Sequence, residues 1–375
     1  MQKDQTFSAW LANFRKTHLG RYNDFFLDKV FRCTDVIPQV LHKDQNQDET
    51  KLSLADYINR FCSHDRLVKG QLEYAKWSEV LDKIEEDFGV PATVLLALWG
   101  IETNYGTVRG DISTLSALAT LAFDGRRCEF FQQELCAAVE ILHKSPNSEK
   151  DLIGSWAGAM GHTQFMPSTY LKYAVDFVGK GWADLWSDNP VDSLASAAYY
   201  LSCHGWNPHV PWGCFVSIPQ HFDYALTAPK IVKTVSEFLD LGLGGLPNKP
   251  DALGSVIVPM GACGPAFWIS DNFSVLKRYN NSMSYALSIG LLSDGFKDGA
   301  LRHLGWPRNT AALSRGDMQK LQSILTDHGF DTQGCDGISG SNTENAIRKF
   351  QNKNGITEDG YPSHKLLDLV SQKLT

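Results

Sequence analysis

One glutamate in this chain stands where a sequence could place a catalytic acid. Residues 91–106 read Pro-Ala-Thr-Val-Leu-Leu-Ala-Leu-Trp-Gly-Ile-Glu-Thr-Asn-Tyr-Gly, with Glu102 as their one acidic residue. The stretch predicts a helix, because Pro91 suits a first helical turn and Asn104 supplies a stop. Almost all its side chains are apolar, so we expect this helix to be buried.

The expected surroundings of Glu102 favour its protonated form. It follows Leu98 by four residues and Trp99 by three, so the three side chains share one face. Burial and the negative end of the helix dipole both raise the pKa of a carboxyl group, as a general acid requires. The alternative is a buried glutamate paired with a lysine or arginine. Because no basic residue follows in the stretch before Arg109, the sequence favours a catalytic role for Glu102 over a buried ion pair.

A second stretch, residues 154–170, could hold a sugar. Its sequence is Gly-Ser-Trp-Ala-Gly-Ala-Met-Gly-His-Thr-Gln-Phe-Met-Pro-Ser-Thr-Tyr. Glycines let the backbone approach a ligand closely, and amide and aromatic side chains lie between them. A tight glycine turn packed under a helix fits the same composition, so the residues alone leave both interpretations open.

The rest of the pattern predicts the elements that must position these residues. Apolar residues at helical spacing predict helices at Phe7–Phe14, Phe25–Phe31, Leu52–Cys62, Leu67–Phe88, Ser113–Phe123, Cys128–His143 and Asn281–Leu292. Short apolar runs between prolines and glycines predict a small β subdomain, with strands at Cys214–Ile218, Ser255–Val258 and Ala266–Ile269. Residues 303–312 predict a linker, because Pro307 blocks a helix there.

Composition excludes several classes of function. The chain has 375 residues, 43% hydrophobic content and a net charge of -7, which argues against nucleic acid as a partner. No apolar run is long enough to span a membrane, and the first residues contain no signal region. The protein is therefore either cytosolic or a mature form whose signal was removed. Motifs of zinc proteases, serine hydrolases and phosphate-binding loops are absent.

The eight cysteines predict neither a zinc site nor a disulfide framework. None has CxxC spacing, and buried free thiols are the expected state. In an oxidising compartment, Cys203 and Cys214 are the first pair to consider for a bridge.

A third group of residues completes a family pattern. Residues 264–267 are Gly-Pro-Ala-Phe, 272–273 are Asn-Phe, and 278–286 are Arg-Tyr-Asn-Asn-Ser-Met-Ser-Tyr-Ala. Together with the two stretches above, and in this order, they resemble the membrane-bound lytic murein transglycosylase B family over roughly Phe7 to Pro307. The resemblance implies a mainly α (α+β) protein with a goose-lysozyme-like helical core, flanked by helical and small β parts. It also implies a lyase that cleaves the MurNAc–GlcNAc β-1,4 bond of peptidoglycan and leaves 1,6-anhydro-MurNAc ends.

The resemblance also assigns roles to individual residues. Glu102 matches the single catalytic acid/base of the family. Substrate contacts are implied for six residues: Ser155, Gln164, Tyr200, Tyr279, Asn280 and Tyr285. Tyr199 stands where the family usually has asparagine, which is a departure in that wall of the site. For Tyr285 the structural alternative is a core tyrosine whose hydroxyl bonds to Glu102, and that role would also orient the acid.

The chain departs from the family at its calcium loop. Many relatives carry alternating aspartates after the Gln-Phe-Met-Pro segment. Here Asp176 could take the first ligand position, but Val178 and Lys180 occupy the next two. A lysine at the loop centre repels a cation, so we expect no metal ion, and we expect no other cofactor.

The tail forms a module of its own. Met318, Leu321, Gln322 and Leu325 share one helical face, and Asp-Gly pairs follow at 336–337 and 359–360. The order of these residues resembles the three-helix peptidoglycan-binding domain. Both aspartates are expected in turns, with no catalytic role. We therefore predict a catalytic domain at 1–310 and a peptidoglycan-binding domain at 311–375, which would raise the local substrate concentration.

Two other functions compete with a lytic transglycosylase. A hydrolytic muramidase needs a second carboxylate roughly 5–9.5 Å from the first, and Asp111 is the weak candidate. A non-catalytic peptidoglycan-binding protein has no use for a buried acid. The expected partners are peptidoglycan glycan strands and no nucleic acid. A monomer in the periplasm is expected, with peripheral or lipid-anchored membrane association through a segment missing from this chain.

Overall fold

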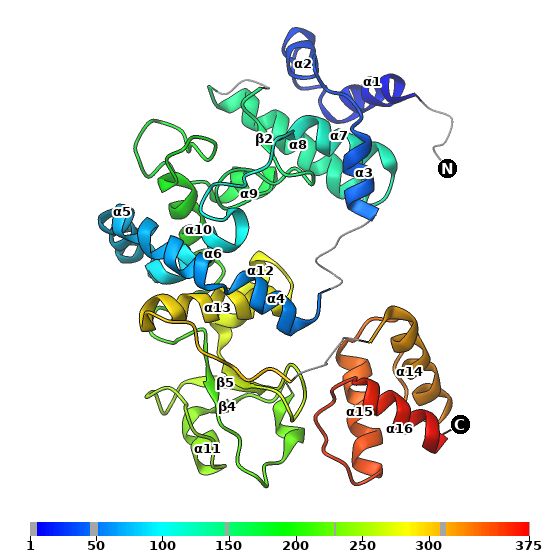
Figure 1. The fold of residues 1–375 in the computed structure, drawn as a ribbon. Coiled ribbons are helices and arrows are strands. Elements are labelled where there is room, and N and C mark those ends of the chain that lie inside the picture. The colour runs from blue at the N-terminus through cyan, green and yellow to red at the C-terminus, as the bar shows by residue number, and fades with distance from the viewer. Residues whose placement is uncertain (1–5, 46–51, 147–149, 229, 308–312, 375) are drawn as a thin grey trace. The chain divides into compact units, whose positions relative to one another are not determined.

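The computed structural model describes residues 6–45, 52–146, 150–228, 230–307 and 313–374. The chain divides into two compact units (Figure 1). Unit 1 comprises residues 1–50, 62–206 and 291–301, and unit 2 comprises residues 51–61, 207–290 and 302–375. Within the described part of the chain, no helix is both long and apolar enough to cross a membrane.

Unit 1 is built mainly from helices around the predicted acid. Its elements are α1 (Phe7–His18), α2 (Asp24–Val30), α3 (Pro38–Gln45), α5 (His64–Phe88), α6 (Ala92–Thr103), β1 (Ile112–Ser113), α7 (Thr114–Asp124), α8 (Cys128–Lys144), β2 (Ile153–Gly154), α9 (Pro167–Tyr173) and α10 (Val191–Cys203). Helix α6 packs against α5 and α10, and α7 packs along α8 (Figure 1).

Helix α6 confirms the prediction for the stretch that holds Glu102. Pro91 lies at its N-cap, and Asn104 ends it in the left-handed conformation with φ 49°. The side chains from Val94 to Gly100 are all buried, as their apolar character requires. This helix therefore forms the centre of unit 1 and carries Glu102 at its C-terminal end.

Of the flanking helices, α1, α2, α5, α7 and α8 were predicted, whereas α3, α9 and α10 were not. The helix predicted from Ser113 onward is α7, and the Ser113 hydroxyl caps it by accepting a hydrogen bond from the backbone N–H of Ser116. Trp10 and Phe14 are buried on α1. In α2, however, Phe25 is 84% exposed, so the predicted apolar face is wrong at that position. The buried face of this short helix is formed by Leu27 and Val30 instead.

Tyr105 is a wedge between two helices of unit 1. Its hydroxyl donates a hydrogen bond to the carbonyl of Arg66 at 2.8 Å, and its ring meets Trp99 edge-on. A Cβ added at Gly70 of α5 would lie 2.4 Å from the Tyr105 hydroxyl oxygen, and one added at Gly100 of α6 would lie 2.6 Å from it. The two helix glycines therefore make room for the tyrosine side chain.

Unit 2 contains the predicted β subdomain, several α-helices and the 3-10 helix η2 (Tyr224–Thr227). The strands are β3 (Gly213–Val216), β4 (Lys233–Thr234), β5 (Leu253–Ile257) and β6 (Ala266–Ile269), in the antiparallel order β3-β6-β5-β4. The α-helices before the tail are α4 (Leu54–Phe61), α11 (Val235–Asp240), α12 (Asp271–Tyr279) and α13 (Met283–Asp298), of which α13 continues into unit 1. Trp268 lies opposite both Cys214 and Val256 and anchors the core of the sheet. The runs predicted for β3, β5 and β6 are confirmed, whereas β4 and α11 were not predicted.

The tail is the predicted three-helix module. Its helices are α14 (Arg315–Asp327), α15 (Ser341–Lys353) and α16 (His364–Leu374), and they share one apolar core (Figure 1). Both Asp-Gly pairs form turns in which a buried glutamine holds the aspartate. Gln322 donates to Asp336 at 3.1 Å, and Gln351 donates to Asp359 at 2.7 Å. The turn interpretation of the two aspartates is thus confirmed.

The predicted linker is described only in its first part. Residues 301–307 form neither helix nor strand, as the linker prediction requires, but residues 308–312 lie outside the described residues. The predicted boundary between 310 and 311 falls there and stays a prediction.

All eight cysteines are free, Cys203 and Cys214 included. Four of the thiols are exposed and four are half-buried, so the expectation of fully buried thiols is wrong.

The wedge at Tyr105 makes Gly100 sensitive to substitution. Gly100→Ala should lower the free energy of unfolding by about 1–3 kcal/mol, because the added methyl group overpacks the contact with Tyr105. Gly316→Ala in α14 is the matched control, since the nearest atom to its added Cβ is 3.9 Å away. Thermal unfolding of both variants checks this expectation. Equal melting temperatures for wild type and Gly100→Ala would show that the helices accommodate the methyl group.

Candidate active site

Glu102 is the next-to-last residue of α6, and its side chain is half-buried. The predicted position at the end of a buried helix is confirmed, and its protonation stays a prediction. The chain turns sharply after it, because Asn104 and Tyr105 both adopt positive φ angles, 49° and 59°. Two consecutive residues in this conformation are costly, and such backbone strain is concentrated at functional sites. Lys69 supports the turn by donating to the carbonyl of Asn104 at 2.8 Å.

The end of α6 is bonded directly to the glycine-rich stretch. The Thr103 hydroxyl donates to the carbonyl of His162 at 2.7 Å, and the same oxygen accepts from the backbone N–H of Gly106 at 3.0 Å. Both Thr103 and His162 are buried. Residues 154–165 are therefore held beside the residue that follows Glu102.

A second connection places Ser155 next to the same segment. Strand β1 pairs with β2 through Ile112 and Gly154. A Cβ at Gly110 would lie 2.1 Å from the carbonyl oxygen of Gly154, so the two backbones touch where only glycine fits. The Ser155 hydroxyl accepts from the N–H of Ala159 at 3.1 Å, which closes the turn. The tight glycine turn of the alternative interpretation is therefore present, and it lies beside the segment that carries Glu102.

Gln164 is fixed by two backbone carbonyls. Its amide nitrogen donates to Arg109 at 3.2 Å and to Gly161 at 3.0 Å. The residue has φ 53°, an uncommon conformation for a non-glycine residue. Both bonds use the amide nitrogen, so they orient the side chain while its oxygen keeps its capacity to accept. The structure thus gives Gln164 a defined orientation in the segment that is bonded to the end of α6.

His162 is the residue that the sequence interpretation missed. Its Nδ1 accepts from the indole N–H of Trp99 at 3.1 Å, and its Nε2 lies 2.9 Å from the carbonyl of Ser187. Because the indole N–H of Trp99 can only donate, Nδ1 carries no proton, and the neutral ring holds its hydrogen on Nε2. The Arg109 guanidinium also lies 3.2 Å from Nε2. Arg109 donates to the carbonyl of Ser187 at 2.6 Å. Burial of the ring lowers the pKa of His162, and the charge of Arg109 acts in the same direction.

Tyr200 lies on α10, one residue after the departure at Tyr199. Its ring meets that of Phe165, which directly follows Gln164, at a centroid distance of 6.0 Å. It also stacks on His204 at 4.1 Å. Tyr199 is 37% exposed and contacts Phe88. The structure therefore links Tyr200, and not Tyr199, to the glycine-rich stretch.

The three remaining predicted residues belong to unit 2. Tyr279 ends α12, Asn280 follows it as an exposed cap, and Tyr285 lies in the first turn of α13. The rings of Tyr279 and Tyr285 are nearly parallel at 6.5 Å. Tyr285 is 2% exposed, which agrees with the alternative of a core tyrosine. The site residues thus form two groups, one in each unit, and their role as a single site stays a prediction.

Two other carboxylates in unit 1, Glu134 and Asp188, are engaged in structural bonds. Glu134 is buried and accepts from both the N–H and the hydroxyl of Ser168. Asp188 pairs with Arg109 at 2.7 Å. Asp111, the weak candidate for a second catalytic carboxylate, is exposed.

The loop that replaces the family's calcium site is closed by its own backbone. Asp176 accepts hydrogen bonds from the N–H groups of Gly179, Lys180 and Gly181 at 2.6–2.8 Å. The Lys180 ammonium lies 3.9 Å from Asp184. Among the described residues, no group of three or more His, Cys, Asp or Glu side chains could hold a metal ion.

His162 could have been suspected from the sequence, since it stands between Gly161 and Thr163 in the stretch proposed to bind a sugar. Its partners could not, because Trp99 precedes it by 63 residues and Ser187 follows it by 25. Arg109 was noted only as the first basic residue after Glu102. The structure makes it a link among Ser187, Asp188 and the side-chain amide of Gln164, which donates to the Arg109 carbonyl.

Both parts of the chain match known protein families. Residues 6–294 match the family described as Transglycosylase SLT domain, so the chain belongs to that family. Residues 314–369 match a peptidoglycan binding domain. The predicted fold class, a lysozyme-like helical core with a helical C-terminal module, is therefore confirmed.

Individual relatives extend this result. The crystal structure of SltB3 from Pseudomonas aeruginosa in complex with NAG-anhNAM-pentapeptide is 39% identical. The match covers 98% of this chain and all of that chain, with a TM-score of 0.93. The Escherichia coli lytic transglycosylase Slt35, solved in complex with calcium, is 28% identical with a TM-score of 0.67, over 77% of this chain and 92% of that one.

The match to one further relative covers only part of the length of that protein. The membrane-bound lytic murein transglycosylase B of Escherichia coli (strain K12) is 34% identical over 239 residues, which are 62% of this chain. The matched part spans 64% of the length of that relative.

The neutral state of His162 predicts a pH dependence of stability. An unfolded histidine has a pKa of about 6.5, and the pKa of His162 is lower in the folded protein. As the pH falls below about 6.5, the unfolded chain binds a proton that the folded chain does not, so stability decreases. The free energy of unfolding, measured by denaturant titration from pH 7 to pH 5, should fall more steeply for wild type than for His162→Gln. His303→Gln, at an exposed histidine, is the control and should keep the wild-type slope. Parallel curves for all three proteins would contradict the neutral assignment.

Calcium should not stabilise this protein. The Asp176 carboxylate already accepts three backbone N–H groups, and the Lys180 ammonium beside Asp184 opposes a cation. We expect the melting temperature in millimolar calcium to equal that in millimolar magnesium. A rise with calcium alone, seen by calorimetry, would show that the loop opens to bind the ion.

Proposed function

We propose that this protein is a lytic transglycosylase. It cleaves the MurNAc–GlcNAc β-1,4 bond of peptidoglycan and leaves 1,6-anhydro-MurNAc ends. Membership of the transglycosylase SLT family supports the reaction class, and the peptidoglycan binding domain supports the substrate. The names of the relatives, a lytic murein transglycosylase B and an SltB3 complexed with an anhydro-muropeptide, agree with it.

In the proposed reaction, Glu102 acts first as an acid and then as a base. Its proton passes to the glycosidic oxygen, the bond to C1 of MurNAc breaks, and the acetamido group stabilises the positive charge that develops there. The Glu102 carboxylate then takes the proton of the C6 hydroxyl, whose oxygen bonds to C1. No water is consumed, and Glu102 ends protonated as it began.

The observation that carries the proposal is the position of Glu102, half-buried at the end of the buried helix α6 and one residue before the contact with the glycine-rich stretch. Glu134 and Asp188 are bonded to groups of the fold, and Asp111 is exposed. A hydrolase needs a second carboxylate to activate water or attack the sugar. In the proposed reaction the sugar's own C6 hydroxyl takes that role, with an effective concentration on the order of 10⁵ M when well oriented.

The substrate contacts are assigned as part of this proposal. Gln164 has its amide oriented by two carbonyls and can bond to a hydroxyl or acetamido group. Tyr200 and Tyr279 offer rings that can stack on sugar faces, and Ser155, Asn280 and Tyr285 complete the set. Because the wall lies outside the cytoplasm, the proposed place of work is the periplasm.

Substitution of the acid separates catalysis from folding. Glu102→Gln keeps the shape of the side chain but removes the proton that the reaction needs, so lysis of purified peptidoglycan should fall at least about 100-fold. The melting temperature should stay close to that of wild type. Glu86→Gln, at an exposed glutamate of α5, is the control and should keep full activity. Full lysis by Glu102→Gln would remove Glu102 from its role and favour a different acid.

The products distinguish a transglycosylase from a muramidase. Anhydro ends are lighter than hydrolysed ends by one water, because the C6 hydroxyl replaces water as the nucleophile. Mass spectrometry of the soluble muropeptides should therefore show mainly anhydro ends. A product set dominated by reducing ends would establish hydrolysis, and no products from the wild-type protein would leave only the binding function.

A further inference from the structure

The peptidoglycan-binding module docks on the β subdomain within unit 2. Arg348 of α15 donates to the carbonyl of Tyr224 at 2.7 Å and to the hydroxyl of Thr227 at 3.1 Å. Asp359 accepts from the backbone N–H of Ala262 at 2.9 Å. A Cβ at Gly261 would lie 2.7 Å from the Asp359 carboxylate, so the two surfaces are in close contact. The module is therefore seated on its neighbour and is not merely tethered by a linker.

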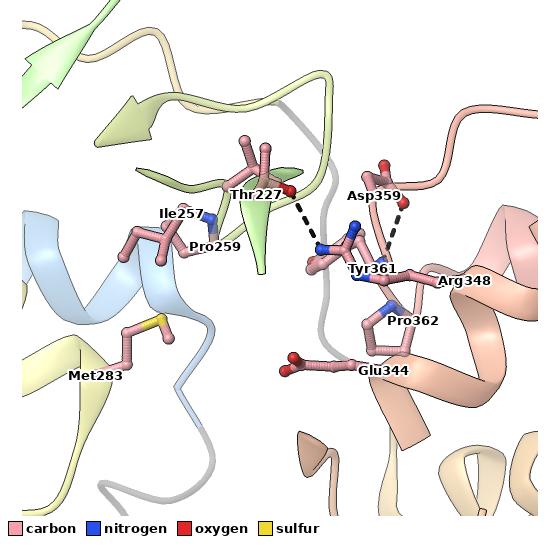
Figure 2. A pocket seen from close by; sticks show the side chains of 11 residues that line it. Thr227, Ile257, Pro259, Met283, Glu344, Arg348, Asp359, Tyr361 and Pro362 are labelled. Carbon is pink, nitrogen blue, oxygen red and sulfur yellow. Dashed lines mark hydrogen bonds between the residues drawn. The ribbon is translucent and has the colours of Figure 1, made fainter. Parts of the chain in front are cut away.

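A pocket remains beside these contacts (Figure 2). Its volume is about 80 Å³, whereas a cavity that holds benzene has about 150 Å³. A pyranose ring with its hydroxyl groups is larger than benzene, so the pocket has room for the end of one side chain and not for a sugar. The lining includes apolar side chains from both parts, among them Ile257, Pro259, Met283 and Pro362.

Three charged side chains line the pocket, and two of them are already occupied. Arg348 is engaged by Tyr224 and Thr227. Asp359 accepts from Gln351, from the N–H of Tyr361 and from Ala262. Both side chains therefore hold the docked module in place, and neither has to meet a ligand.

The third charged side chain, Glu344, is different. Figure 2 shows its carboxylate pointing across the pocket toward Met283. Within the described part of the chain it forms no ion pair and accepts no hydrogen bond, although it is largely removed from water. Burial raises the pKa of Glu344, and the charges of Arg348 and Lys277 only partly oppose this effect. A half-buried carboxylate without a partner is costly, and a cation in the pocket would remove that cost.

We propose that this pocket binds an aliphatic side chain that ends in a primary ammonium group, of the kind carried by the diamino acid of a peptidoglycan stem peptide. The methylene groups would lie against the apolar lining, and the ammonium would donate to the Glu344 carboxylate. The module then recognises the peptide of the wall, while the glycan is left to the catalytic part of the chain. This inference rests on the peptidoglycan substrate proposed above.

The pocket can be tested with a soluble peptide. The probes are the tripeptide L-Ala-γ-D-Glu-L-Lys and the same peptide acetylated on its lysine side chain, titrated calorimetrically into the full chain. The free amine should bind wild type at least about tenfold more tightly than it binds Glu344→Gln. Asp368→Asn removes one charge from an exposed position of the same module and should bind as wild type does. The acetylated peptide should bind wild type as weakly as the free amine binds Glu344→Gln.

Several results would overturn the proposal. No binding of the amine peptide to wild type, equal binding to wild type and Glu344→Gln, or equal binding of the two peptides would each do so. The acetylated peptide keeps the test valid even if Glu344→Gln fails to fold. Failure of the proposed activity would instead appear as full lysis by Glu102→Gln or as reducing ends in the products, and neither measurement involves the tripeptide.

Discussion

The hydrogen bond from the Thr103 hydroxyl to the carbonyl of His162 is the contact on which the site in unit 1 depends. It joins the end of α6 to the glycine-rich stretch at a point one residue from Glu102. Both groups are buried, so the loss of either partner would leave a polar atom without a bond and would cost roughly 1–3 kcal/mol. The left-handed turn after α6 and the backbone contact at Gly110 follow from this arrangement, because the chain must reverse immediately to run beside residues 154–165.

Local features of the sequence were sufficient to predict most elements. The helix that carries Glu102, the Ser113 cap and the strands β3, β5 and β6 all follow from patterns that lie within a dozen residues. The family assignment confirms the family resemblance, whereas the site segments that the resemblance indicated stay a prediction. Among the elements that were not predicted, β4 and α11 have only two and six residues, which contain too little pattern to be recognised. The helices α3, α9, α10 and α12 were also missed.

What the sequence could not show depends on partners that are distant along the chain. Neither the neutral ring of His162 nor the wedge of Tyr105 can be inferred without Trp99, Ser187 and Gly70 in place. The contact between the C-terminal module and the β subdomain is a similar case. A linker between two recognisable domains indicates a flexible tether, yet Arg348 and the second Asp-Gly turn contact the β subdomain directly. Tertiary contacts, and not local propensity, decided each of these features.

The carboxylates of this protein divide by what they bond to. Asp192 is 2% exposed and accepts from three backbone N–H groups, at Phe177, Val178 and Asp184. Both oxygens of this carboxylate are therefore engaged by the backbone of the fold. A catalytic acid has a different requirement, because it must lose and regain its proton in every turnover. Glu102, half-buried at the end of a helix whose backbone is secured by Thr103, suits that requirement. Under the proposed function, chemistry falls to Glu102, whereas Asp192 serves the stability of the fold.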